Sequence, residues 1–268
     1  MSKIASGSKE GRFAGDRLYY RRWGAPSDAK AQVVISHGFA EHSGRYGHVA
    51  SALNDGGFDV WALDHRGHGR SEGDRADIES VSAAVADLDL FVDVVAEAAP
   101  EQPTFLVGHS MGGLIAAAYA EDHQDRLKGL VLSGALLYVA PEIVALAELE
   151  EIPDLGLADA VSSDPSVVKA YKEDPLVYLG PPPRRFIESF GQVEDVRSRL
   201  KELTLPILAM HGSGDLLVSP QALRDLMSLV SSEDLTTVLW PGLWHEIFNE
   251  PRQGEVLSTL VNWIAARA

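Results

Sequence analysis

The feature that most constrains the fold is the stretch 107–113, Val-Gly-His-Ser-Met-Gly-Gly, in which a serine stands between glycines in a G-x-S-x-G pattern. An apolar run with strand character, 104–107, precedes it, and a run of small, helix-favouring residues, 114–120, follows it. This arrangement is typical of a nucleophile elbow at a strand-to-helix junction. Gly108 and Gly112 lack a Cβ and let the turn tighten. We therefore predict that Ser110 is a nucleophile; the alternative is a turn that only packs a helix against a sheet.

Strand-like and helix-like runs alternate along most of the chain. We expect strands over 17–23 (at an edge of the sheet), 31–36, 58–63, 104–107, 129–133, 205–211 and 235–240. We expect helices over 45–55, 78–99, 114–120, 221–231 and 252–267, with a turn over 24–30 and a frayed segment over 1–11. Because most of these strands are short continuous apolar runs, they predict an α/β fold with a mostly parallel central sheet flanked by helices.

The alternation stops after Ser133. The segment from 136 to 201 has acidic helical pieces such as 143–151 and three consecutive prolines at 181–183. We interpret it as a mainly helical cap inserted after the sixth strand. This predicts a core with a first part over 1–135, a cap over 136–201 and a second part of the core over 202–268.

Composition excludes several classes of function. The 268 residues include no cysteine, which excludes disulfides, thiol catalysis and thiolate metal sites. A net charge of −16 disfavours nucleic acid and anionic membranes as partners. The chain has neither an apolar N-terminal signal nor an apolar run of membrane-spanning length, so we expect a cytoplasmic protein.

A serine hydroxyl needs a base, and the base needs an orienting group. Two expected strands end in loops that carry such groups, Asp215 after 205–211 and His245 after 235–240. Because functional groups of parallel sheets gather at the carboxyl ends of strands, we expect these two side chains to meet Ser110. The chain order Ser, Asp, His is the order found in α/β-hydrolases.

Acyl transfer also needs donors for the developing oxyanion. The backbone N–H of Met111, first in the expected helix after the serine, is one candidate. The backbone N–H of Phe39, in the loop after strand 31–36, is the second; an ordinary strand-exit turn is the alternative there.

Four motifs together resemble the monoacylglycerol lipase family of α/β-hydrolases, and the resemblance covers about residues 15–267. They are HGFAEHSGRY, DHRGHGRSEG, GHSMGG and PGLWHEIFNEP. The resemblance implies hydrolysis of 1(3)- and 2-monoacylglycerols to glycerol and fatty acid without a cofactor. It also implies a mobile cap with an apolar tunnel for the acyl chain, and transient contact of this cap with lipid surfaces. A broader carboxylesterase or lysophospholipase with the same triad, and a non-catalytic binding protein on the same fold, are the alternatives.

The resemblance extends to single residues. Glu41 and Arg45 match positions near the glycerol end of the site or bracing its walls, with a structural ion pair as the alternative. His65 and His68 have a spacing compatible with a metal, but no third ligand is suitably placed, so we expect no metal site. His109 and Ser36 are expected to be structural.

One departure from the family concerns glycerol. Phe248 stands where some animal members carry a histidine that helps to hold glycerol, so the bacterial type, in which a cap carboxylate helps, is the closer comparison. The candidates for this carboxylate are Glu148, Glu150, Glu151 and Asp154, with a solvated helix face as the alternative for most of them. The candidates for the tunnel wall or a lipid-facing surface, with ordinary core packing as the alternative, are Leu136, Leu137, Ile143, Val144, Leu146 and Leu149.

Overall fold

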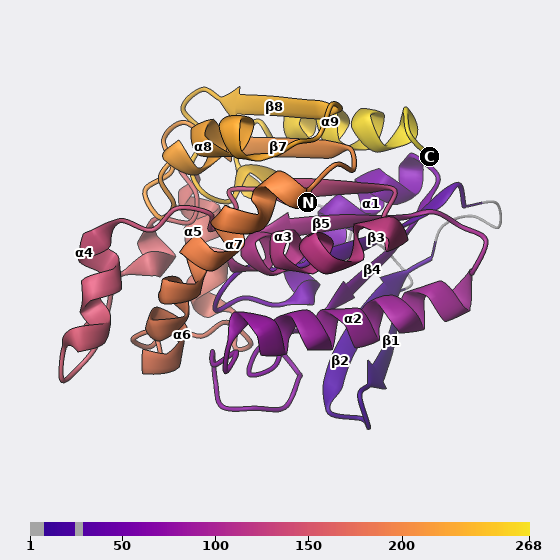
Figure 1. The fold of residues 1–268 in the computed structure, drawn as a ribbon. Helices are drawn as coiled ribbons and strands as arrows, with labels where there is room; N and C mark the ends of the chain where they lie inside the picture. Colours follow the sequence, from indigo (N-terminus) through magenta and orange to yellow (C-terminus); the bar gives the residue numbers. More distant parts are fainter. Residues whose placement is uncertain (1–7, 25–28) are drawn as a thin grey trace.

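The computed structural model describes residues 8–24 and 29–268, which are built around one eight-stranded sheet (Figure 1). The spatial order of the strands is β1-β2-β4-β3-β5-β6-β7-β8. All neighbouring pairs from β4 to β8 are parallel, and β1 and β2 form an antiparallel extension at one side. The strands are β1 (Ser8–Phe13), β2 (Leu18–Trp23), β3 (Ala31–Ser36), β4 (Phe58–Leu63), β5 (Thr104–His109), β6 (Gly129–Ser133), β7 (Ile207–Gly212) and β8 (Leu235–Trp240).

Helices cover both faces of this sheet, as the predicted α/β fold requires. Helices α1 (Gly47–Asp55) and α9 (Gln253–Ala265) pack on one face. Helices α2 (Val81–Ala98), α3 (Met111–His123) and α8 (Gln221–Leu229) pack on the other. Among the described residues, no helix combines the length and the apolar character needed to span a bilayer.

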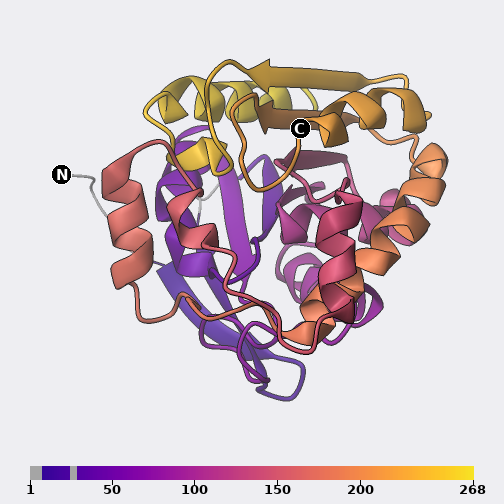
Figure 2. The ribbon, with the colours of Figure 1, turned by 90° about the vertical axis from the view of Figure 1, so that its left-hand side faces the viewer.

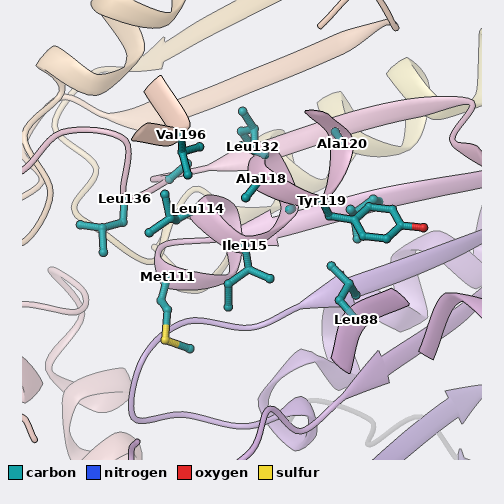
Figure 3. Packing of buried hydrophobic residues seen from close by; sticks show 14 of the residues in the cluster. Leu88, Met111, Leu114, Ile115, Ala118, Tyr119, Ala120, Leu132, Leu136 and Val196 are labelled. Carbon is teal, nitrogen blue, oxygen red and sulfur yellow. The ribbon is translucent and has the colours of Figure 1, made fainter. Parts of the chain in front are cut away.

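The core between α3 and its neighbours supports the turn that holds Ser110, the predicted nucleophile. Helix α3 is buried nearly all round, and its side chains meet Leu88 of α2, Leu132 of β6 and Val196 of α7 (Val193–Arg199) (Figure 3). Such a helix has apolar and small residues on every side rather than on one face. The start of α3, which follows Ser110, is therefore rigidly placed.

Between β6 and β7 the described chain contains only helices and connecting segments, laid across the carboxyl ends of the parallel strands (Figure 2). Four α-helical elements and four 3-10 turns make up this part. They are α4 (Pro141–Val144), η3 (Ala145–Glu148), η4 (Leu157–Asp159), α5 (Pro165–Glu173), α6 (Arg184–Glu188), η5 (Ser189–Gln192), α7 and η6 (Leu200–Glu202). The insertion after the sixth strand is confirmed, and the domain boundaries at 135/136 and 201/202 stay a prediction.

The N-terminal expectations need correction. Residues 8–11, expected to be frayed, belong to β1, which pairs with β2 from Ser8↔Trp23 to Phe13↔Leu18. The predicted edge strand 17–23 is therefore covered on that side, and β1 is the edge. Because β1 is mostly polar, its side chains carry no apolar pattern, and its pairing depends on the backbone. Residues 1–7, and residues 25–28 of the expected turn, lie outside the described residues.

The remaining elements follow the predictions closely. The strands predicted over 31–36, 58–63, 129–133 and 235–240 have the predicted bounds, and β5 extends two residues further, to His109. The helix expected to start at 45 begins as a 3-10 turn, η1 (Ser43–Tyr46), and becomes α-helical at Gly47. The helix expected from 78 begins at Val81, after Ser80 has capped it.

Candidate active site

Ser110 lies in a strained turn between β5 and α3. Its φ of 53° and ψ of −120° are rare for a residue with a side chain, and such conformations cost about 1–3 kcal/mol and gather at functional sites. The glycines around it are required by close contacts. A Cβ on Gly112 would lie 2.2 Å from the carbonyl oxygen of Ser36, and one on Gly108 would lie 2.5 Å from that of Gly112. The Ser110 N–H donates to the carbonyl of Ser133 on β6, 3.0 Å away, which fixes the turn.

The structure brings Asp215 and His245 together in the loops after β7 and β8. Their Oδ2 and Nδ1 atoms are 2.8 Å apart. The other oxygen of Asp215 accepts the backbone N–H groups of Leu217 and Val218, at 2.8 and 2.9 Å. His211 Nε2 lies 3.0 Å from Oδ2. Because Nδ1 of His245 donates to this carboxylate, the neutral ring keeps its lone pair on Nε2, where it can accept a proton.

The charges of this pair follow from its surroundings. Burial lowers the pKa of His245, but the carboxylates of Asp215, Glu246 and Glu41 together outweigh burial, and the pKa of His245 lies above its ordinary value. Burial raises the pKa of Asp215, but His245 and His211 together lower it by more, to well below its ordinary value. Asp215 is therefore ionised at neutral pH. Its carboxylate stabilises the imidazolium form of His245 without taking the proton itself.

Ser110, Asp215 and His245 line one cavity of about 620 Å³ under the cap. Among the described residues, the side chain of His245 is hydrogen-bonded to Asp215, and His245 also lines this cavity. Most of the remaining lining is apolar. It includes Phe39, Leu136, Tyr138, Val139, Ile143, Leu155, Leu157, Val161, Phe186, Phe190, Leu216, Leu217 and Val218.

The two predicted oxyanion donors flank this site. Met111 is the first residue of α3, so its N–H has no carbonyl one turn earlier in the helix. Phe39 follows Gly38, whose N–H donates to Glu41 Oε1 at 2.8 Å, and precedes Ala40, which has a φ of 68°. In the part of the chain that the structure describes, neither amide N–H is bonded to a protein acceptor. Both donors are thus available to a negatively charged oxygen.

Glu41 and Arg45 form a buried ion network with Glu246. Arg45 lies 2.7 Å from Glu41 Oε2 and 2.6 Å from Glu246 Oε1, and its guanidinium stacks over the ring of Tyr171 of the cap, 4.5 Å away. Burial raises the pKa of Glu41, but Arg45, His109, His37 and the Tyr46 hydroxyl together lower it by more, to about 2. Glu246 is not among the site residues expected from the sequence. Its only signal is its position directly after His245 in the motif PGLWHEIFNEP.

His109, His65 and His68 each have a protein partner. His109 Nδ1 lies 3.0 Å from the carbonyl of Ser133, consistent with the expected structural role, and its ring also faces the cavity. His65 Nε2 bonds Ser36 Oγ at 2.9 Å, and His68 Nδ1 bonds a backbone carbonyl at 2.8 Å. His65 Nδ1 and His68 Nε2 have no hydrogen-bond partner among the described residues, and no group of three or more possible metal ligands lies together in that part of the chain.

The cap candidates divide into two groups. The four acidic residues, Glu148, Glu150, Glu151 and Asp154, are exposed and lie outside the lining of the 620 Å³ cavity. Leu136 and Ile143 line it, whereas Leu137 lies in the core and Val144 and Leu149 are exposed to solvent. Phe248 is buried against α9 and does not reach the cavity.

Comparison with known proteins places these features in a wider group. Residues 27–252 match the family described as serine aminopeptidase, S33. A monoacylglycerol lipase of Mycolicibacterium smegmatis is 40% identical, over 98% of this chain and 99% of its own length. Human monoglyceride lipase is 33% identical, over 94% of this chain and 88% of its own. The crystal structure of a Paleococcus ferrophilus monoacylglycerol lipase superposes with a TM-score of 0.82 at 32% identity, over 94% of this chain and 99% of the other.

Proposed function

The chain belongs to the serine aminopeptidase S33 family, with monoacylglycerol lipases among its relatives, and on this premise we propose that it hydrolyses monoacylglycerols to glycerol and a fatty acid. The proposal rests on Ser110 and the Asp215–His245 pair at one cavity, with two amide N–H groups that have no protein acceptor among the described residues, that of Phe39 in the lining and that of Met111 next to Ser110. This set contains a nucleophile, an oriented base and donors for an oxyanion, which is what ester hydrolysis through an acyl-enzyme requires.

In the first half of the reaction, Ser110 Oγ attacks the ester carbonyl carbon while His245 Nε2 takes its proton. The carbonyl oxygen becomes an oxyanion, which accepts hydrogen bonds from the N–H groups of Phe39 and Met111. The tetrahedral intermediate then breaks the bond to the glycerol oxygen, and His245 gives that oxygen its proton. Asp215 holds the imidazole in the correct tautomer and stabilises the imidazolium throughout.

In the second half, water takes the place of glycerol. His245 accepts a proton from the water as its oxygen attacks the acyl carbon, and the same two N–H groups stabilise the second oxyanion. Collapse breaks the bond to Ser110 Oγ, which recovers a proton from His245, and the fatty acid leaves. The consumed water supplies the hydroxyl of the acid and the hydrogen of the glycerol.

The lining of the cavity supports a neutral lipid with a small head group. Apolar side chains from the cap and the β7 loop suit an acyl chain, while Glu41 and Glu246 lie on a wall beside the catalytic groups. Of the described residues that line the cavity, none is lysine or arginine, so nothing there would offset a phosphate. Glu41 and Arg45 brace this wall through the ion network, as the sequence resemblance allows.

The cap and the loop after β7 together supply a surface suited to lipid contact. Ile143 and Leu216 line the cavity and are 37% and 66% exposed, and Val144 and Leu149 extend the apolar surface with 37% and 44% exposure. Apolar side chains at the rim of a cavity can enter the surface layer of a lipid aggregate. In this proposal residues 136–201 are a lid, the enzyme visits lipid surfaces peripherally, and the acyl chain passes from the surface into the cavity.

A panel of esters that share one acyl chain tests the substrate. Turnover of a monoacylglycerol is expected to exceed that of the matching methyl ester and lysophosphatidylcholine. Equal rates on monoacylglycerol and methyl ester would reduce the enzyme to a general carboxylesterase, and preference for the lysophospholipid would contradict the proposed head group.

A further inference from the structure

Two glutamates in the wall of the cavity share one arginine. Arg45 Nη1 lies 2.7 Å from Glu41 Oε2 and 2.6 Å from Glu246 Oε1, and Nη2 lies 2.7 Å from Glu246 Oε2. The side chains of Glu41, Glu246 and Arg45 are only 4%, 5% and 11% exposed. Buried charges at such distances hold their partners in one geometry, because breaking the pair would leave a charge without compensation.

One end of this network holds the loop that carries Phe39, one of the two oxyanion donors. Oε1 of Glu41 accepts the N–H of Gly38 at 2.8 Å and the hydroxyl of Tyr46 at 2.7 Å. Gly38 directly precedes Phe39, whose N–H is one of the two proposed donors. A movement of the Glu41 carboxylate therefore moves the peptide that leads to this donor.

The other end holds the loop of the base. Glu246 directly follows His245, and its backbone N–H donates to the carbonyl of Val161 in the cap at 2.8 Å. Its Oε2 also accepts the side-chain amide of Asn249 at 2.9 Å. Both carboxylate oxygens are thus bonded, and the side chain has a fixed direction relative to His245.

We propose that Glu246 is a positioning residue for the ester hydrolysis proposed above, and that through Arg45 it fixes the oxyanion loop relative to the His245 loop. These two loops follow β3 and β8, which are not neighbours in the sheet because β5, β6 and β7 lie between them. The Glu41–Arg45–Glu246 network supplies a direct connection. Both halves of the reaction use the donors and the base together, so the connection serves both halves.

The network of two glutamates and one arginine also has a net negative charge, and it lies near His245. The titratable groups that face His245 are Asp215 from the β7 loop, His109 from the end of β5, Glu41 from the β3 loop and Glu246 from its own loop. The three carboxylates favour the imidazolium, and His109 opposes it when it is charged. Removing the charge of Glu246 alone therefore destabilises the imidazolium.

The test compares Glu246→Gln with Glu250→Gln on a monoacylglycerol and on a water-soluble aryl ester. Glu250 is a matched control, because it lies in the same stretch of chain, is 1% exposed, and bonds Ser163 instead of Arg45. For Glu246→Gln we expect kcat to fall by about ten- to a hundredfold on both esters, the loss typical of misplaced catalytic groups. We expect KM to stay near the wild-type value. We also expect the acid limb of the kcat/KM profile to move to lower pH than in the wild type, because the His245 imidazolium is less stable. Glu250→Gln is expected to keep the wild-type kcat and pH profile.

Three results would overturn the proposal: a wild-type kcat in Glu246→Gln, an equal loss in both variants, or a rise in KM confined to the monoacylglycerol, which would make Glu246 a glycerol contact. Circular dichroism and thermal unfolding show whether each variant folds. If Glu246→Gln does not fold, Arg45→Lys, which keeps the charge but not the two-pronged contact, is expected to give the same loss of kcat. A wild-type enzyme that cleaves only the aryl ester would refute the proposed substrate, and the variants on that ester would still decide the role of Glu246.

Discussion

The imidazole rings of His109 and His245 lie with their centroids 4.8 Å apart and their planes inclined by 48°. Burial, together with the nearby His245, lowers the pKa of His109 to about 4, whereas the pKa of His245 lies above its ordinary value. Two neighbouring imidazoles therefore differ in charge over a broad pH range. His109 is neutral throughout the range in which His245 changes between base and acid.

The pH dependence of activity follows from this difference. His245 must be unprotonated in the free enzyme to accept the serine proton, so kcat/KM should fall as pH decreases through the pKa of His245. Because that pKa is raised above 6.5, the midpoint should lie above pH 6.5. A pH profile with a soluble aryl ester, whose own charge does not change in this range, measures it. A midpoint near 4 would assign the titration to His109 instead.

Asp215→Asn should remove most of the activity while the fold persists. The amide can still accept the N–H groups of Leu217 and Val218 through Oδ1, but it no longer fixes the His245 tautomer or stabilises the imidazolium. The same change in a serine protease triad lowers kcat by about 10⁴-fold, and we expect a loss of that order. Asp234→Asn, at the half-exposed ion pair with Arg267, is the control and should retain activity. Equal activity in the two variants would contradict the assignment of Asp215.

Gly112→Ala tests whether close packing under the nucleophile turn is required. The added Cβ would lie 2.2 Å from the carbonyl oxygen of Ser36 and 2.3 Å from that of His37, so β3 or α3 must move. Overpacking of this kind costs about 1–3 kcal/mol or more of stability, and the displaced oxyanion loop should lower kcat as well. Gly254→Ala in α9, where a Cβ would have open space, should be neutral or stabilising by up to about 1 kcal/mol. Urea unfolding and kcat measure both effects, and a fully active, stable Gly112→Ala protein would refute this packing account.

The amino-acid sequence was sufficient to predict the elements that depend on apolar runs and on glycine. Strands such as β3 and β6 are fully buried, so each is a short apolar run with clear limits. Ser110, Asp215 and His245 could be expected to meet because each follows a strand of one parallel sheet, and such strands end at the same edge.

Other parts depend on tertiary contacts that no local pattern records. The β1 strand has few apolar residues and shows no alternating apolar pattern, so only its pairing with β2 defines it as a strand. Glu246 looks like any polar loop residue, and only its contact with Arg45, 201 positions earlier in the chain, gives it a role. The apolar cap residues all resemble one another in sequence, yet Ile143 lines the cavity whereas Leu137 lies in the core.

The exposed rim of the cavity predicts an interfacial effect. Ile143→Ser combined with Leu216→Ser should weaken binding to zwitterionic vesicles and lower the rate on a monoacylglycerol in mixed micelles, because apolar area at the rim is lost. The rate on a soluble aryl ester should change little. Leu239→Ser on β8 is the control, because that side chain is 40% exposed and outside the cavity lining. If the Leu239 variant shows the same defect as the rim variant, the rim of the cavity is not the lipid-contacting surface.

Glycerol release from a medium-chain monoacylglycerol, compared between the wild-type protein and Ser110→Ala, tests the central claim most directly. We expect the wild type to release glycerol and fatty acid in equal amounts. Loss of the serine hydroxyl should reduce the rate by about 10⁶-fold, the order found when a triad nucleophile is removed. A Ser110→Ala protein that folds and still releases glycerol at a comparable rate would contradict the mechanism.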